Sequence, residues 1–171
     1  VVLVRKLGAP DEPELAIGAV ANGAAPETVL NDKLVAALGV GADYIEAETA
    51  RQLATIERRR RGYAGLRPGV DPAGRAAIVV DDGVATGMTM RAALRSVRRL
   101  GPSRLVAATP VASQDALAML RREADAAVCL SAPGRFLSVG SFYRSFAQVS
   151  EEDVVRLLGE AAARVAQGGI S

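Results

Sequence analysis

The sequence predicts an α/β fold with an open, mostly parallel sheet and helices on both of its faces. Two observations predict this class. Short apolar runs rich in alanine and valine alternate with amphipathic stretches in the second half of the chain, and strands that alternate with helices of about ten residues pair in parallel through right-handed crossovers. The length of 171 residues suits one domain, so we expect residues 1–171 to form a single unit.

In the first half, we expect strands over residues 1–4, 15–20 and 28–30, with a polar loop over 5–13. A short helix is expected over 31–39. A longer one starts near Asp43, since apolar side chains recur there every three or four residues. It ends at Arg58 to Arg61, where cations favour the negative end of the helix dipole, and a loop is expected over 63–74. Because the chain opens directly on a strand, we expect that further residues precede Val1.

The second half is more regular. Strands are expected over 76–80, 105–108 and 126–130. Met90, Leu94 and Val97 mark the inner face of a helix that Gly101 terminates. Ser113 caps the next helix, and the acids after Ser150 begin a closing helix.

The composition excludes several kinds of chemistry. The chain has no histidine, which excludes an imidazole base, and a single cysteine, which excludes an internal disulfide framework and a thiolate metal cluster. With 21 basic and 19 acidic residues the net charge is +2, too balanced for a protein built around nucleic acid. No apolar run reaches the roughly 18 residues of a membrane span, and no signal peptide opens the chain. We therefore expect a cytoplasmic protein with no nucleic-acid or membrane partner.

The chemistry is expected in the segment from Ala77 to Thr89. An apolar strand runs into two adjacent carboxylates, Asp81 and Asp82, and then into a loop of small and hydroxylated residues before a helix. Ligands bind at the carboxyl ends of parallel strands, and small side chains let backbone N–H groups approach an anion. The helix N-terminus adds partial positive charge. The predicted phosphate loop consists of Val84, Ala85, Thr86, Gly87, Met88 and Thr89.

The acidic pair beside this loop indicates the rest of the ligand. Carboxylates repel phosphate oxygens but accept hydrogen bonds from hydroxyl groups. A phosphorylated ribose satisfies both parts of the segment, with its phosphate on the loop and its 2- and 3-hydroxyls on Asp81 and Asp82. A solvated strand-end turn is the simpler alternative. A phospho-acceptor receiver domain is excluded because no lysine follows Lys33.

This segment resembles the ribose-phosphate motif of the type I phosphoribosyltransferases, including an uncharacterised bacterial subgroup of that family. It departs from the motif at Gly83, where the family usually has an aliphatic residue. The resemblance implies an enzyme that takes phosphoribosyl pyrophosphate and Mg²⁺, transfers ribose 5-phosphate to a nitrogenous acceptor and releases pyrophosphate. Asp81 and Asp82 would be the catalytic residues. The Mg²⁺ would arrive with the pyrophosphate rather than on protein ligands.

Two further regions take their meaning from this resemblance. Arg5 and Lys6 would bind the pyrophosphate, with a solvated strand end as the alternative. Residues 131–150 would form a small hood, and its aromatic side chains, Phe136, Phe142, Tyr143 and Phe146, would face the acceptor base or pack as a local core. The run Arg58 to Arg61 is expected to be a solvated helix end, with a place beside a substrate-covering loop as the alternative.

The family resemblance leaves a second function open. Some proteins of this fold are regulators that keep the ribose-phosphate pocket without turnover, and the glycine at position 83 favours that alternative. A structural domain of a larger chain is a third possibility. The resemblance also implies that residues upstream of Val1 complete the pocket, and a homo-oligomer is possible.

Overall fold

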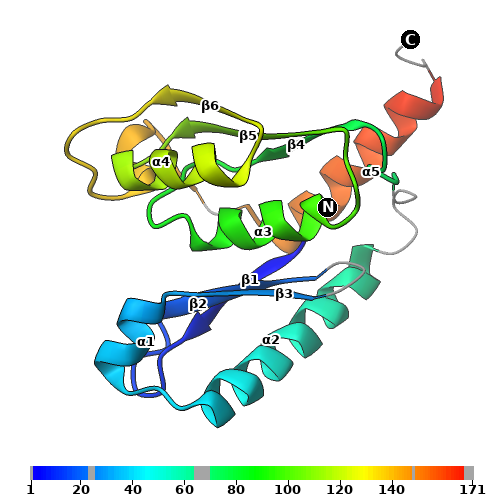
Figure 1. Ribbon diagram of the computed structural model, residues 1–171. Helices are drawn as coiled ribbons and strands as arrows, with labels where there is room; N and C mark the ends of the chain where they lie inside the picture. The colour runs from blue at the N-terminus through cyan, green and yellow to red at the C-terminus, as the bar shows by residue number, and fades with distance from the viewer. Residues whose placement is uncertain (1, 23–25, 64–69, 148, 168–171) are drawn as a thin grey trace.

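The computed structural model describes residues 2–22, 26–63, 70–147 and 149–167, the side chains only as far as 164. Its strands form two three-stranded sheets (Figure 1). The first sheet is antiparallel and consists of β1 (Val4–Gly8), β2 (Ala16–Ala21) and β3 (Glu27–Leu30). The second is parallel and consists of β4 (Ala76–Val80), β5 (Arg104–Val111) and β6 (Ala126–Ser131). The helices are α1 (Asp32–Leu38), α2 (Ala42–Tyr63), α3 (Met88–Arg98), α4 (Gln114–Glu123), the short 3₁₀ helix η1 (Val139–Phe142) and α5 (Glu151–Gln167).

Helix α3 lies between the two sheets (Figure 1). One side of it buries Met90 and Leu94 against the parallel sheet, where they meet Leu105 of β5. Its other side buries Ala92 against Ala19 and other small residues of the antiparallel sheet. Small side chains on both partners let the helix and the sheet approach closely, so one helix with apolar residues on two sides joins the two sheets.

Helix α2 covers the outer face of the antiparallel sheet, and α4 lies beside α3 on the inner face of the parallel sheet. Ile56 of α2 packs against Leu7 and Ile17 on the face of the antiparallel sheet that points away from α3. Ala116 and Leu120 of α4 join the same core as Leu94 of α3, beneath the parallel sheet. The opposite face of the parallel sheet presents four exposed apolar side chains, Ile78, Val80, Val128 and Leu130.

The α/β class and the open parallel sheet agree with the prediction from the sequence. The first strand does not lie at residues 1–4 as expected, because β1 covers Val4–Gly8 and pairs Arg5 with Val20 and Lys6 with Ala19. The polar pair was expected in a loop, but antiparallel pairing tolerates polar residues when one face of a strand is only partly covered. The turn comes later, where Pro10 cannot continue the pairing.

The arginine run ends α2 as predicted. Arg60 Nε lies 2.8 Å from Glu57 Oε2, and Arg61 Nε lies 3.6 Å from Glu57 Oε1. All four arginines are exposed, as expected for a solvated helix end. Of the predicted loop 63–74, Tyr63 is the last residue of α2, and residues 64–69 lie outside the described part of the chain.

No helix among the described residues is both long enough and apolar enough to cross a membrane.

Candidate functional site

The two carboxylates lie directly after β4, at the carboxyl end of the parallel sheet. The Asp81 N–H still donates to the Ala108 carbonyl at 3.2 Å, which ties the residue to β5. The Asp82 N–H then turns back and donates to Asp81 Oδ1 at 3.0 Å. Asp81 is half-buried whereas Asp82 is exposed, so the adjacent carboxylates have different surroundings.

Burial raises the pKa of Asp81 above its ordinary value of 3.8, and the nearby Asp82 carboxylate raises it further. The hydrogen bond from the Asp82 N–H lowers it in part. No cationic side chain pairs with Asp81 among the residues that the structure describes, and partly desolvated carboxylates of this kind concentrate at functional sites. Asp81 is therefore a candidate for binding a ligand rather than for holding the fold together.

The loop after the acidic pair is held by the neighbouring strand and helix. The Val84 N–H donates to Val111 O, and the Val84 carbonyl accepts from the Ser113 N–H, both at 2.9 Å. The Ser113 hydroxyl donates to the Ala85 carbonyl at 2.7 Å and also accepts from the Ala116 N–H, which caps α4. One serine thus fixes both α4 and the predicted phosphate loop, while Ala85 and Thr86 remain exposed.

Gly87 connects this loop to α3. Its φ of +82° lies in the left-handed region, and it is the N-cap of α3 without a side-chain capping hydrogen bond. The first N–H groups of a helix have no partner within the helix, so those at the start of α3 are open to an external acceptor. A Cβ on Gly87 would collide with the Met119 side chain. The Met119 methyl group is the flexible end of its side chain and can move aside, so it is the backbone angle that requires glycine here.

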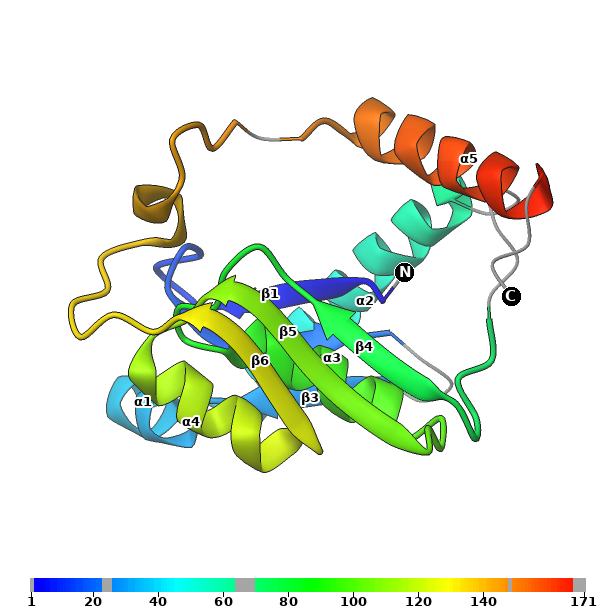
Figure 2. The same ribbon diagram turned by 90° about the horizontal axis from the view of Figure 1, so that it is seen from above.

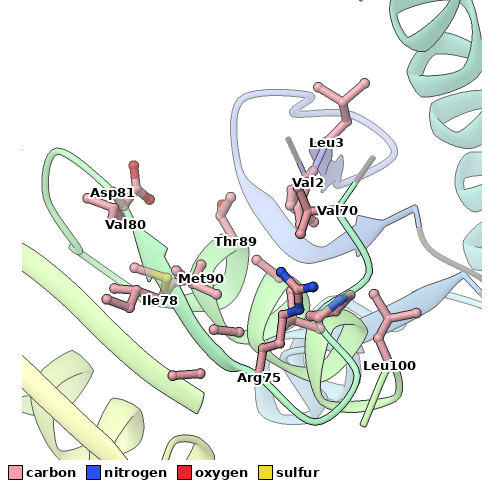
Figure 3. A pocket seen from close by; sticks show the side chains of 17 residues that line it. Val2, Leu3, Val70, Arg75, Ile78, Val80, Asp81, Thr89, Met90 and Leu100 are labelled. Carbon is pink, nitrogen blue, oxygen red and sulfur yellow. The ribbon is translucent and has the colours of Figure 1, made fainter. Parts of the chain in front are cut away.

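A cavity of about 820 Å³ adjoins the site (Figure 3). Asp81 and Thr89 both line it, so the acidic turn and the first turn of α3 open onto the same space. Val2 and Leu3 line it from the antiparallel sheet side, and Arg75 lies further along, just before β4. The sequence did not single out Arg75, because an isolated arginine before a strand carries no distinctive pattern.

The predicted pyrophosphate residues point to opposite sides of β1, since neighbouring side chains alternate along a strand. The Arg5 Nε donates to Gln52 Oε1 of α2 at 3.0 Å, and Gln52 in turn donates to the buried Glu48 at 2.8 Å. Lys6 is exposed and shares its face with Val4, which packs toward α3. Of the two, Lys6 is therefore the one on the face of β1 that points toward α3.

Of the hood segment, residues 131–150, residue 148 lies outside the described part of the chain; residues 131–147 run from β6 past the carboxyl end of the parallel sheet (Figure 2). The Tyr143 hydroxyl donates to the Asp82 carbonyl at 2.6 Å. A Cβ on Gly83 would stand less than 3 Å from both methyl groups of Val139. Gly83 has no positive φ, so the departure from the family motif is required by space. The absent side chain makes room for the hood segment.

Aromatic rings of the hood segment pack in pairs. The centroids of Phe136 and Phe142 lie 5.2 Å apart, and those of Tyr143 and Phe146 lie 5.1 Å apart. Phe142 and Phe146 are exposed. The cluster is thus a local packing unit that still presents ring surface to solvent next to the acidic turn.

The donor set limits how a metal could bind. Among the described residues there is no group of three or more His, Cys, Asp or Glu side chains that could hold a metal ion. Mg²⁺ commonly binds through one or two carboxylates together with substrate phosphates. The acidic pair fits that mode, with the ion brought by a phosphorylated substrate.

Known proteins resemble the chain in sequence and in structure. A family described as "Phosphoribosyl transferase domain" matches residues 13–136. The chain is 39% identical over 169 residues to proteins from two strains of Mycobacterium tuberculosis, named "Putative phosphoribosyl transferase Rv0571c" and "Putative phosphoribosyl transferase MT0597". The match covers 99% of the chain but only 38% of each relative.

The structure is similar to the crystal structure of TT1426 from Thermus thermophilus. The TM-score is 0.74 and the sequence identity 44%. The similarity covers 95% of this chain and 76% of that chain.

Proposed function

Because the chain belongs to the type I phosphoribosyltransferase family, we propose that its site takes phosphoribosyl pyrophosphate with Mg²⁺ and transfers ribose 5-phosphate to a nitrogenous acceptor. One observation carries this proposal. A single segment, from Asp81 to Thr89, joins two carboxylates to the uncapped N-terminus of α3. The two carboxylates would accept hydrogen bonds from the ribose hydroxyls, and the N-terminus of α3 would bind the 5-phosphate.

The 5-phosphate would bind at the start of α3. Three features support this: the open N–H groups of the first turn, the hydroxyl groups of Thr86 and Thr89, and the partial positive charge of the helix N-terminus. Ser113 and Gly87 shape the loop in advance. The phosphate would therefore meet a preorganised site rather than order a flexible one.

The acidic pair would hold the 2- and 3-hydroxyls of the ribose. In the transfer, the bond from the anomeric carbon to the pyrophosphate oxygen breaks, and its electron pair leaves with pyrophosphate. The acceptor nitrogen forms the new bond to that carbon and loses its proton to solvent. Positive charge grows on the sugar ring in between, and ionised Asp81 and Asp82 would stabilise it. No covalent intermediate with the protein is needed.

Positioning would supply much of the rate. Holding the acceptor and the sugar in line lowers the activation barrier by about 7–11 kcal/mol in favourable cases. Mg²⁺, bound to the pyrophosphate, would neutralise the leaving group. Lys6 supports the same role from its exposed place on β1, and Arg5 would need to leave or share its hydrogen bond with Gln52.

The test is calorimetric titration with phosphoribosyl pyrophosphate and Mg²⁺, followed by pyrophosphate release over a panel of nitrogenous bases. We expect binding, and we expect Asp82→Asn to weaken it by about ten- to hundredfold, the range for hydrogen bonds to a charged group. Asp43→Asn, an exposed carboxylate in the first turn of α2, is the matched control. Absence of binding to the wild-type chain would overturn the proposal.

Binding without turnover on any acceptor would instead identify a ribose-phosphate-binding regulator. Gly83 no longer favours that alternative, since packing against Val139 accounts for it. We therefore keep the transferase as the function that the geometry supports best.

A further inference from the structure

The turn that carries the two carboxylates has few main-chain anchors. The Asp81 N–H is bound to the Ala108 carbonyl, and the Val84 N–H to the Val111 carbonyl. Between these two points, the peptide that joins Asp82 to Gly83 takes part in no strand of either sheet. Something other than sheet pairing must hold its orientation.

Tyr143 supplies that contact from a part of the chain 61 residues away. Its hydroxyl donates to the Asp82 carbonyl at 2.6 Å, toward the short end of the range for O–H···O bonds. The Asp82 N–H donates to Asp81 Oδ1. Tyr143 therefore holds the peptide group after the Asp82 Cα, and the Asp81 carboxylate holds the peptide group before it, so the two hydrogen bonds fix the Asp82 backbone from both sides.

The segment that carries Tyr143 also fits the turn by shape. The side chain of Val139 fills the space where Gly83 has no Cβ. The Tyr143 ring packs on Phe146 with centroids 5.1 Å apart, and the Phe146 ring in turn lies against Gly140. Tyr143 is thereby held within its own segment. Its hydroxyl can direct the Asp82 carbonyl instead of merely following it.

We propose that Tyr143 is a positioning residue: its hydroxyl sets the orientation of the Asp82–Gly83 peptide and, through it, the directions of the Asp81 and Asp82 carboxylates. The consequence for ligand affinity rests on the proposed function, whereas the effect on the carboxylates does not. The hood segment then contributes to the ribose site through one hydroxyl group, in addition to any contact that its rings make with an acceptor.

The test compares Tyr143→Phe with Tyr63→Phe. Both changes remove one hydroxyl and keep the ring, and the Tyr63 hydroxyl donates only a long bond of 3.5 Å to Glu151, away from the acidic pair. The first measurement is the carbon-13 NMR signals of the Asp81 and Asp82 carboxyl groups in the chain without ligand at pH 7. We expect Tyr143→Phe to shift both signals, and Tyr63→Phe to leave them unchanged.

The second measurement is the affinity for phosphoribosyl pyrophosphate with Mg²⁺. Loss of one neutral hydrogen bond is expected to weaken it by about three- to tenfold, with the affinity of Tyr63→Phe equal to that of the wild type. Thermal unfolding of each variant checks that the fold is intact, and Val139→Ala, which loosens the same segment without touching the hydroxyl, should shift the carboxyl signals less than Tyr143→Phe.

The two measurements separate the two proposals. If the wild type does not bind the ligand, the proposed function fails, and the carboxyl signals alone decide the role of Tyr143. Carboxyl signals that respond no more to Tyr143→Phe than to Tyr63→Phe would overturn that role. Unchanged affinity in Tyr143→Phe, with a wild type that binds, would overturn it as well.

Discussion

Replacing Gly83 by alanine tests whether space, rather than backbone angle, requires this glycine. The added Cβ would stand less than 3 Å from both methyl groups of Val139 and 3.1 Å from Val111 Cγ1. Overpacking of this kind costs about 1–3 kcal/mol. Because Gly83 has no positive φ, alanine also restricts the unfolded chain, which contributes about 0.4–1 kcal/mol in favour of folding. At the centres of these two ranges, the net loss in free energy of unfolding should be about 1 kcal/mol.

A second substitution makes the prediction sharper. Val139→Ala removes the methyl groups that the new Cβ would meet, at a cost of about 1 kcal/mol for a partly buried valine. In that background Gly83→Ala should be neutral or slightly stabilising, because only Val111 has to yield by a few tenths of an ångström. The double-mutant cycle should show a favourable coupling of about 1–2 kcal/mol.

The assay is urea unfolding at equilibrium of the wild type, the two single variants and the double variant. Equal costs of Gly83→Ala in both backgrounds would refute the reasoning, since the collision would then not involve Val139. A neutral Gly83→Ala in the wild-type background would refute it too. After either result, packing against Val139 would no longer explain why position 83 is a glycine.

Three further outcomes are expected. Gly87→Ala should cost about 1–3 kcal/mol of unfolding free energy because a φ of +82° strains alanine, and Met119→Ala should not rescue it; rescue would show that space alone matters there. Burial raises the pKa of Asp81 in the folded chain above 3.8, so ionised Asp81 lowers the stability of the fold at pH values above this raised pKa. Asp81→Asn should therefore raise the urea midpoint at pH 7 while weakening ligand binding. This gain in stability should vanish below pH 3.8. Hydrogen bonds from Arg98 and from the Leu105 N–H lower the pKa of Asp125 to about 2, so its stabilising contribution should be complete above pH 3.8 and disappear as the pH falls toward 2; acid titrations of Asp125→Asn that match the wild type across this window would contradict the assignment.

Much of the site could be predicted because it is local in sequence. The strand before Asp81 and the helix after Gly87 each have a clear period, and the acids stand between them. The backbone angle of Gly87 and the anchoring role of Ser113 refine that local picture. The predicted roles of Asp81, Asp82 and the loop residues remain predictions that binding experiments will decide.

What could not be predicted depends on contacts between distant segments. The polar residues Arg5 and Lys6 favoured a loop in the prediction from sequence, whereas in the structure they belong to β1 and pair with β2. The contacts of Tyr143 with Asp82 and of Val139 with Gly83 join positions about sixty residues apart, which no local pattern reports. The one signal was the glycine at position 83, and only the structure shows which side chain occupies its space.

The central claim is that the segment from Asp81 to Thr89 binds a ribose 5-phosphate group, and NMR titration of the chain with ribose 5-phosphate tests it most directly. The account predicts that the backbone amide signals of residues 85–90 and the carboxyl signals of Asp81 and Asp82 move together along one saturable curve. Inorganic phosphate should move the amide signals alone. Saturation that leaves these residues unchanged, or no response to the ligand, would contradict the account.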